Sequence, residues 1–300
     1  MSAWKRGLDA AGILEPELRR AYSAQRKAVR RFRRSSYLAA RILLPPALLP
    51  HAVAATAFMH HGDDVLDTGT ATQRAAAWTV WQRRVRTALE SGQGDDPLIG
   101  AMLHTIGACP RLRPVVEDYL TTATAELEFE GFATEGDYQA YVDAYSHPAF
   151  MLVATLLGPE DDDGPFRAAC RTLIDGSQRL DFVNDLAEDL REGRLGIPQE
   201  TLRRFSVSVE ELWEGRRPAG LVELVAHGVR AAGAALRAAG AQSDLAAPEG
   251  RPLMRALVDI ELRTADAALE RGAGLLRGPA SPPPAGTVRT LLRERRAARG

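Results

Sequence analysis

The sequence predicts an all-α fold in a single domain, and three observations favour it. Alanine, leucine and arginine dominate the chain, and all three have high helix propensity. Alternation of apolar and polar residues with the period of a β-strand is scarce. Apolar residues make up 45% of the 300 positions, which is ample for one large core. We therefore expect residues 1–300 to form one helical domain.

Charge and cysteine content narrow the classes of partner and the compartment. A formal net charge of -1 argues against nucleic acid as the main partner. Cys109 and Cys170 lack the spacing of metal ligands or of a disulfide, which fits a reducing compartment. The sequence has no signal peptide and no apolar run of transmembrane length. We expect a cytoplasmic protein without a stable membrane anchor.

The N-terminal third is expected to contain three helices. Residues 14–32 form the first, and its many Lys and Arg residues are explained by a solubilising face or by weak attraction to an anionic surface. The second is short and ends at Pro45 and Pro46, because proline disrupts the preceding turn. The apolar run 48–59 is typical of a buried helix.

That buried helix leads into a first group of carboxylates. Asp63 and Asp67 are four residues apart and share a helix face, and Asp64 lies beside them. Buried helices rarely carry carboxylates unless these are paired or bind a metal. The pair therefore indicates a site and not only a solvated surface.

The middle of the chain predicts further helices. We expect them over 70–91 and 115–131, and from 138 onward after a capping box formed by Thr134 and Asp137. Pro148 should break this last helix because it lacks an N–H and clashes one turn back.

A second acidic group lies in the helix expected over 166–191. Asp181, Asp185 and Asp189 follow one another at every fourth position and form one ridge, with Glu188 beside it. Like charges at this spacing repel, and Mg²⁺, which prefers carboxylate and phosphate oxygens, would compensate them. A solvated acidic face explains one such ridge equally well. Two acidic helices facing each other would instead enclose several Mg²⁺ ions and a diphosphate.

The remainder of the chain predicts a short helix opened by a capping box at Ser208 and Glu211, and two long helices over 221–239 and 253–275. The last residues, 276–300, are rich first in Pro and Gly and then in Arg, and we expect a mobile tail.

With both acidic groups in view, the chain resembles the squalene/phytoene synthase family of all-helical, Mg²⁺-dependent prenyltransferases. The family's first aspartate-rich motif corresponds to Asp63-Asp64-Val65-Leu66-Asp67, and its second to Asp185-Leu186-Ala187-Glu188-Asp189 with the segment 191–199. The resemblance covers about 34–270. It implies a single-domain class I isoprenoid synthase helical bundle with a central cavity and a core of about 34–275.

The resemblance also implies roles for individual residues. The leading carboxylates Asp63, Asp67, Asp185 and Asp189 are expected to be catalytic. The expected metal ligands are Asp63, Asp64, Asp67, Asp181, Asp185, Glu188 and Asp189. The expected diphosphate-binding residues are Arg34, Ser35, Gln178, Asn184 and Arg194, although Ser35 is alternatively a helix N-cap. The expected cavity or acceptor residues are Tyr37, His60, Glu126, His147, Phe150 and Asp181.

Several positions depart from the family pattern. His60 and Asn184 stand where arginines are usual, Phe150 where glycine is frequent, Asp181 where asparagine is usual, and Thr264 where a tyrosine is typical. A histidine held in the core is the simpler explanation of His60. Together the changes weaken a second diphosphate subsite and shorten the cavity.

We therefore expect Mg²⁺-dependent transfer of a short prenyl group from an allylic diphosphate of the dimethylallyl type to an aromatic small molecule such as a carbazole, in secondary metabolism. The alternative is head-to-head condensation of two prenyl diphosphates, or a related step on a squalene precursor. A third hypothesis is a non-catalytic helical subunit that stabilises a partner enzyme. The expected partners are the prenyl diphosphate and a small-molecule acceptor, and the expected assembly is a monomer or homodimer.

Overall fold

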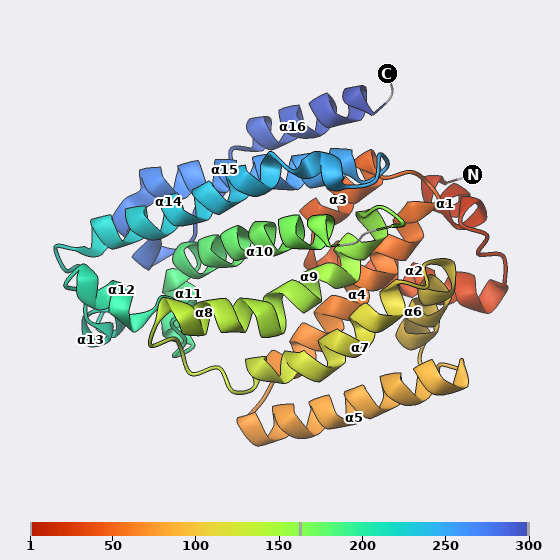
Figure 1. Cartoon of the computed structure of the whole chain (residues 1–300), viewed down its shortest axis with the longest axis horizontal. Coiled ribbons are helices and arrows are strands. Elements are labelled where there is room, and N and C mark those ends of the chain that lie inside the picture. The colour runs from red at the N-terminus through yellow and green to blue at the C-terminus, as the bar shows by residue number, and fades with distance from the viewer. Residues whose placement is uncertain (1, 162–163, 299–300) are drawn as a thin grey trace.

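The architecture is helical throughout the part of the chain that the structure describes. The computed structural model describes residues 2–161 and 164–298, and no β-strand occurs among them. Figure 1 shows α5 along one edge of an elongated bundle and α16 along the opposite edge, with α10 between them. The predicted all-α class is confirmed.

The helices of the first half include those expected over 14–32 and 70–91, which are α2 and α5. In chain order, the helices of this half are α1 (Ala3–Ala10), α2 (Pro16–Phe32), α3 (Arg34–Leu43), α4 (Leu48–Asp67), α5 (Ala71–Ser91), α6 (Pro97–Ala108) and α7 (Leu112–Thr122), followed by the 3₁₀ turn η1 (Ala123–Glu126).

The second half continues the bundle and ends in three long helices. Its α-helices are α8 (Glu135–Tyr141), α9 (His147–Ala154), α10 (Pro165–Asn184), α11 (Leu186–Arg191), α12 (Gln199–Arg204), α13 (Val209–Trp213), α14 (Leu221–Gly240), α15 (Arg251–Arg271) and α16 (Pro284–Ala297). Shorter turns are η2 (Val142–Ser146), η3 (Thr155–Leu157), η4 (Ser243–Leu245) and η5 (Gly272–Arg277).

Helix α4 is the central helix of the first half. It packs against α2, α5, α6 and α9, which explains why apolar residues surround its axis instead of forming one stripe. Phe58 and Leu66 are fully buried. The helix continues past the apolar run to Asp67, so the first acidic motif occupies its last turns.

Helix α8 does not break at Pro148. The chain instead passes through a π-helical segment, η2, and Pro148 enters the first turn of α9, where its missing N–H leaves no hydrogen bond unmade.

The helix predicted over 115–131 was too long, because α7 ends at Thr122 and only the turn η1 follows.

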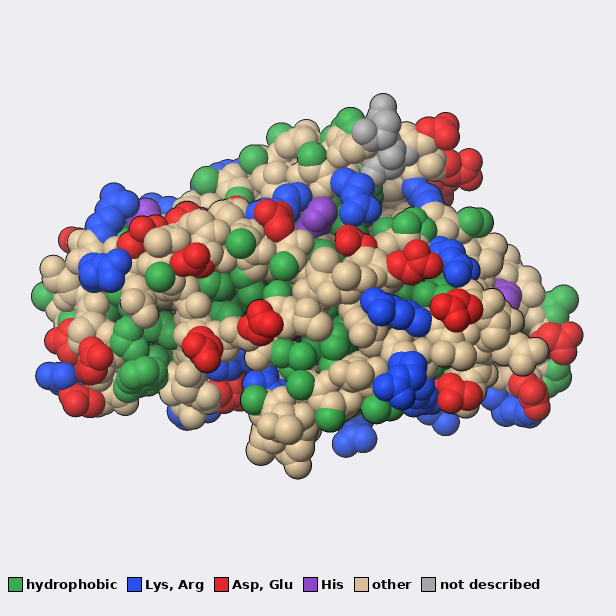
Figure 2. All heavy atoms as spheres, turned by 60° about the horizontal axis from the view of Figure 1, so that its bottom comes forward, with side chains coloured by type: hydrophobic (Ala, Val, Ile, Leu, Met, Phe, Trp, Pro, Cys, Tyr) green, Lys and Arg blue, Asp and Glu red, His purple; other side chains and the backbone are tan. Residues whose placement is uncertain are grey.

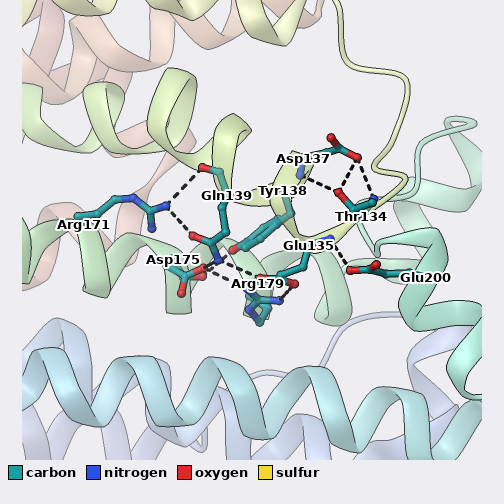
Figure 3. A network of polar contacts seen from close by, with 9 residues as sticks. All are labelled: Thr134, Glu135, Asp137, Tyr138, Gln139, Arg171, Asp175, Arg179 and Glu200. Atoms are coloured by element: carbon teal, nitrogen blue, oxygen red, sulfur yellow. Dashed lines mark hydrogen bonds and ion pairs between the residues drawn. The ribbon is translucent and has the colours of Figure 1, made fainter.

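A polar network fixes α8 against α10 (Figure 3). Arg179 of α10 forms an ion pair with Glu135, with 3.0 Å between Nη1 and Oε2, and its guanidinium lies 4.2 Å from the centroid of the Tyr138 ring. Gln139 donates to Asp175 at 3.1 Å. These contacts hold the segment that carries Tyr141 and Tyr145 toward the acidic helices.

The second acidic ridge is not one continuous helix. Helix α10 ends at Asn184 and α11 starts at Leu186, while Asp185 between them has φ −91° and ψ 12°. The N–H of Asp185 still donates to the carbonyl of Asp181 at 2.8 Å. The break therefore turns the chain at the first aspartate of the second motif.

The C-terminal segment differs from the expected mobile tail. Within 276–298, η5 ends at Arg277, and α16 packs on α15 and α3. The two final positions of the predicted tail, 299–300, lie outside the described residues. The sequence was misleading here because three consecutive prolines, Pro282 to Pro284, lead into the first turn of a helix, a position that proline favours.

The surface carries both signs of charge. Figure 2 shows acidic and basic side chains interspersed over one face, with apolar side chains visible between them. Among the described residues, no helix is both long enough and apolar enough to cross a bilayer.

Candidate active site

The last turns of α4 present two carboxylates toward η2 and the segment after α11. The hydroxyl of Tyr145 donates to Asp63 Oδ1 at 2.7 Å, and Nδ1 of His60 lies 3.6 Å from Asp63 Oδ2. One turn later, Asp67 Oδ1 lies 3.5 Å from Nη1 of Arg194. The sequence motif and the arginine that follows the second motif thus meet in space.

Asp64 lies on another side of the same helix. It lines a small pocket of about 110 Å³ between α2, α4 and α6, together with Val29 and Leu98. His60 also lines this pocket. The structure therefore separates Asp64 from Asp63 and Asp67, as the 100° step between successive helix residues requires.

Glu126 is the buried anchor of the site. Its side chain is 2% exposed and accepts hydrogen bonds of 2.5 Å from the Tyr141 hydroxyl and from Nη2 of Arg194. The Arg194 guanidinium also lies 4.9 Å from the centroid of the Phe129 ring. Because a buried charge must be paired, Glu126 fixes the position of Arg194.

A polar cleft opens beside these groups. Its volume is about 790 Å³, within the range of small-molecule sites. It is lined by Asp67, Gly69, Arg74, Phe129, Phe182, Asp189, Glu192, Gly193 and Arg194. Both motifs and two arginines therefore share one cleft.

Arg74 is a lining residue that the sequence analysis missed. Its Nη1 donates to the Leu66 carbonyl at 3.0 Å, while its buried Nε has no partner among the described residues. It lies seven residues after Asp67, across the turn that joins α4 to α5. A basic residue shortly after the first motif was the available signal.

The carboxylates of the two acidic groups are electrostatically strained. Burial, together with the neighbouring Glu261 and Asp185, raises the pKa of Asp181 to about 8. Burial and the neighbouring Asp185 raise the pKa of Asp189 to about 7, and burial and Glu126 raise that of Asp67 to about 6. Asp181 keeps solvent-accessible surface although many protein atoms surround it.

This excess of negative charge fits a bound cation. No set of three or more His, Cys, Asp or Glu residues in the described chain is arranged as a complete metal site. Mg²⁺ does not require one, because it is commonly held by one or two carboxylates and by the phosphates of the substrate. Asp63 and Asp67 on one side and Asp185 and Asp189 on the other could hold such an ion.

Two further charged residues at the second motif were not predicted as site residues. Glu261 of α15 is bonded to Ser177, and burial raises its pKa to about 6. Arg33, between α2 and α3, lowers the pKa of Asp181, Asp185 and Glu261 through its positive charge. Both were hard to identify because they come from segments distant in sequence from the motif.

Arg34 and Ser35, which were predicted to bind diphosphate, are exposed in the first turn of α3. Arg33 occupies the N-cap position, so Ser35 is not the cap. Tyr37 is buried, with the Arg30 guanidinium 5.7 Å from its ring centroid.

The side-chain amide of Asn184 is hydrogen-bonded to the backbone. Its Nδ2 donates to the Ala280 carbonyl at 3.2 Å, and its Oδ1 accepts from the Ala280 N–H at 2.9 Å. This pairing ties the end of α10 to the segment before α16. Gln178 accepts a hydrogen bond of 2.9 Å from Ser146, and Glu188 is exposed on α11.

His147 and Phe150 of α9 were predicted to line the cavity, but neither is among the residues that line the cleft between the two motifs. His147 lies beside Arg167 and Arg171, and burial lowers its pKa to about 4. Its Nε2 is buried without a partner among the described residues. Phe150 is partly buried against the main apolar core.

A bundle of helices with two acidic segments facing a cavity and arginines at its rim has the architecture of an isoprenoid synthase. The family profile described as "Squalene/phytoene synthase" matches residues 29–285, and the chain belongs to this family. Members of the family are prenyltransferases that release diphosphate.

The relatives agree with this assignment. The chain is 28% identical over 211 residues to the bifunctional protein CrtB/UppS of Streptomyces coelicolor, covering 70% of this chain and 37% of that protein. It is 26% identical over 209 residues to the 15-cis-phytoene synthase of Synechococcus elongatus, covering 66% and 67%. The chain thus spans little more than a third of the first relative.

Solved structures show the same fold. A squalene synthase, HpnC, from Alicyclobacillus acidocaldarius superposes with a TM-score of 0.75 at 21% identity, covering 90% of this chain and 99% of that one. A dehydrosqualene synthase in complex with a ligand gives 0.80 at 18% identity, covering 94% and 98%.

Proposed function

We propose that this protein is a Mg²⁺-dependent prenyltransferase that transfers a short prenyl group from one allylic diphosphate to an aromatic small molecule. The observation that carries the proposal is the acid pair Asp181 and Glu261, which lies beside Asp185 of the second motif. A second diphosphate would be repelled there, whereas a neutral acceptor with an N–H or O–H group finds two carboxyl groups to bind.

We assign the diphosphate of the donor to the polar cleft described above. Arg194 and Arg74 line the cleft beside Asp67 and Asp189, so the diphosphate is expected there. Mg²⁺, when bound, neutralises the leaving diphosphate. Asn184 is not expected to bind it, because its amide is already paired with Ala280.

The chemistry follows from this arrangement. The C–O bond of the donor breaks and the diphosphate leaves with the electron pair. The acceptor ring supplies the electron pair of the new C–C bond to the allylic cation, and the ring proton then passes to a carboxylate such as that of Glu261, whose pKa of about 6 leaves it ionised near neutral pH. Tyr141, Tyr145 and Phe129 around the site help to exclude water, which would otherwise capture the cation.

Head-to-head condensation of two prenyl diphosphates is the second candidate. The relatives named as phytoene, squalene and dehydrosqualene synthases favour it, and the folds of the last two match over 90% and 94% of this chain. It requires a second anion subsite, for which Arg33, whose positive charge acts on Asp181 and Asp185, is an available cation.

Product analysis separates the two candidates. The protein is incubated with Mg²⁺ and dimethylallyl, geranyl or farnesyl diphosphate, each with and without a panel of tricyclic aromatic acceptors, and products are identified by mass spectrometry. We expect a product one prenyl unit heavier than an acceptor. A hydrocarbon formed from a prenyl diphosphate alone would overturn the main proposal in favour of condensation.

Variants test the assigned roles. Asp63→Ala and Asp185→Ala should abolish every activity, since both remove a proposed metal ligand. Glu261→Gln should raise KM for the acceptor more than KM for the diphosphate, while Glu270→Gln at the exposed end of the same helix should change neither. Full activity in Asp63→Ala would contradict the metal assignment.

A further inference from the structure

Helix α16 is oriented with polar residues inward and apolar residues outward. Thr290 is fully buried and donates to Asp259 of α15, and Glu294 is 5% exposed. On the outer side, Val288 is 55% exposed and Leu292 is 45% exposed. A helix on the surface of a globular protein usually has the reverse arrangement.

The outer side forms one continuous groove of about 500 Å³. Its residues follow the i, i+3, i+4 spacing of a single helix face and are Ala285, Val288, Arg289, Leu292, Arg293 and Arg296. We call these six residues the α16 face. Most of α16 lies beyond residues 29–285, the part of the chain that matches the family profile.

The exposed charge on this helix is of one sign. Arg289, Arg293, Arg295 and Arg296 are exposed, whereas Glu294, the sole acidic residue of α16, is buried and accepts from Arg293 Nε at 2.8 Å. A helix face that combines apolar side chains with arginines is suited to the headgroup region of an anionic bilayer.

The charge also argues against a second copy as the occupant. A two-fold interface would place the same arginines opposite one another, and like charges disfavour such a contact. An anionic lipid surface supplies the complementary charge and accepts the two apolar side chains together.

We propose that the α16 face docks the protein peripherally on anionic membranes. The guanidinium groups contact lipid phosphates, and Val288 and Leu292 enter the region between headgroups and acyl chains. The contact is reversible, because one short helix buries little apolar area.

Vesicle co-sedimentation of the full chain tests this proposal. Vesicles of phosphatidylcholine alone are compared with vesicles that contain about one third phosphatidylglycerol, at low and high salt. We expect binding to the anionic vesicles only, weakened by salt because screening reduces the attraction between charges.

Two variants address the two components of the face. Arg289→Gln with Arg296→Gln should weaken binding by about 25-fold, from about five-fold for each arginine. Val288→Ser with Leu292→Ser should weaken it by about ten-fold, from the lost apolar contact. Arg293 is left unchanged because it also lies 3.6 Å from Asp259.

Helix α5 offers a matched control. Val80 is 53% exposed and Arg83 is exposed one turn later, so Val80→Ser with Arg83→Gln removes the same residue types elsewhere. The control should bind vesicles as the unmodified protein does, and all variants should keep the same unfolding midpoint. Absence of binding to anionic vesicles, or an equal loss in the control, would overturn the proposal. So would a dimer that the α16 variants convert to a monomer without any vesicle binding.

Discussion

At the scale of single residues, the site is organised by a buried ion pair. Glu126 is almost completely enclosed, and Arg194 compensates its charge while also facing Asp67. We therefore assign Arg194 a structural role toward Glu126 and propose a second role toward the substrate, and variants can separate the two.

The variant Arg194→Gln should lower the free energy of unfolding by about 3 kcal/mol, because it leaves the Glu126 carboxylate buried without a counter-charge. The double variant Arg194→Gln with Glu126→Gln should recover most of this loss. Activity should remain low in both, since the phosphate-facing cation is absent. Urea unfolding and product assays check the two effects, with exposed Arg191→Gln as the control. An active double variant would contradict a role for Arg194 toward the substrate.

The sequence was informative about residues that lie within motifs and much less about those that complete them. Asp63, Asp67 and Arg194 come together as their spacing and resemblance implied. Glu261 and Arg33 reach the second motif from other helices, and no local pattern marks them. Asn184 fills a motif position but pairs with backbone 96 residues later, which a sequence cannot reveal.

At the scale of helices, the packing of α4 on α7 depends on the absence of one side chain. A Cβ at Gly62 would lie 2.1 Å from the hydroxyl oxygen of Tyr119, and that hydroxyl is itself buried without a partner among the described residues. Gly62 directly precedes Asp63, so this close contact also fixes the position of the first motif relative to α7.

Gly62→Ala should therefore destabilise the protein by about 1–3 kcal/mol through overpacking. Tyr119→Phe should be neutral or slightly stabilising, because it removes an unpaired buried hydroxyl. The double variant should recover much of the loss, a coupling that thermal unfolding measures. Gly100→Ala, where a Cβ meets open space within a helix, is the control and should stabilise. Strictly additive effects would show that the contact is not the cause.

A buried polar cluster joins α2, α4 and α6. The Tyr22 hydroxyl lies 2.7 Å from Thr105 Oγ1, 3.3 Å from His51 Nδ1 and 3.0 Å from His104 Nδ1. Burial, and to a lesser degree His104, lowers the pKa of His51 to about 4. The folded protein thus keeps His51 neutral where the unfolded chain binds a proton.

The contribution of His51 to stability is present above its ordinary pKa of 6.5 and is lost as the pH falls toward 4. The loss should approach about 1.4 kcal/mol per pH unit within that window. Urea unfolding at pH 7 and pH 5 should show a smaller decrease for His51→Gln than for the unmodified protein. The comparison cancels the site carboxylates, whose raised pKa values act in the opposite direction. Equal decreases would contradict the prediction.

The helices themselves were largely predictable, because apolar periodicity and caps are local features. The capping boxes at Thr134 and Ser208 are present as predicted. The errors fall where proline or tertiary packing decides. Pro148 starts α9 after a π-helical segment, and α16 forms where a mobile tail was expected.

At the scale of the whole molecule, carboxylates from α4, α10, α11 and α15 lie near the two acidic motifs with few arginines to balance them. Such an arrangement is held together by the rest of the fold against mutual repulsion. A ligand that brings positive charge should therefore stabilise the entire molecule.

We expect Mg²⁺ with inorganic pyrophosphate to raise the midpoint of thermal unfolding. At a ligand concentration about 100 times Kd, the gain is about 2.7 kcal/mol. Asp63→Asn or Asp185→Asn should reduce the gain strongly, whereas Asp118→Asn on the surface of α7 should not. Pyrophosphate without Mg²⁺ should have little effect. An equal shift in all variants would show that binding occurs elsewhere.

The pairing of Asn184 with Ala280 has a consequence for biosynthesis. The end of α10, which carries the second motif, is completed by backbone 96 residues further along. During translation the earlier helices fold first, as the N-terminal part of a chain emerges before the rest. The end of α10, which leads into the proposed metal ligands, therefore acquires its final partner among the last steps of synthesis, so that a nascent chain carries both acidic motifs long before the segment around them is complete.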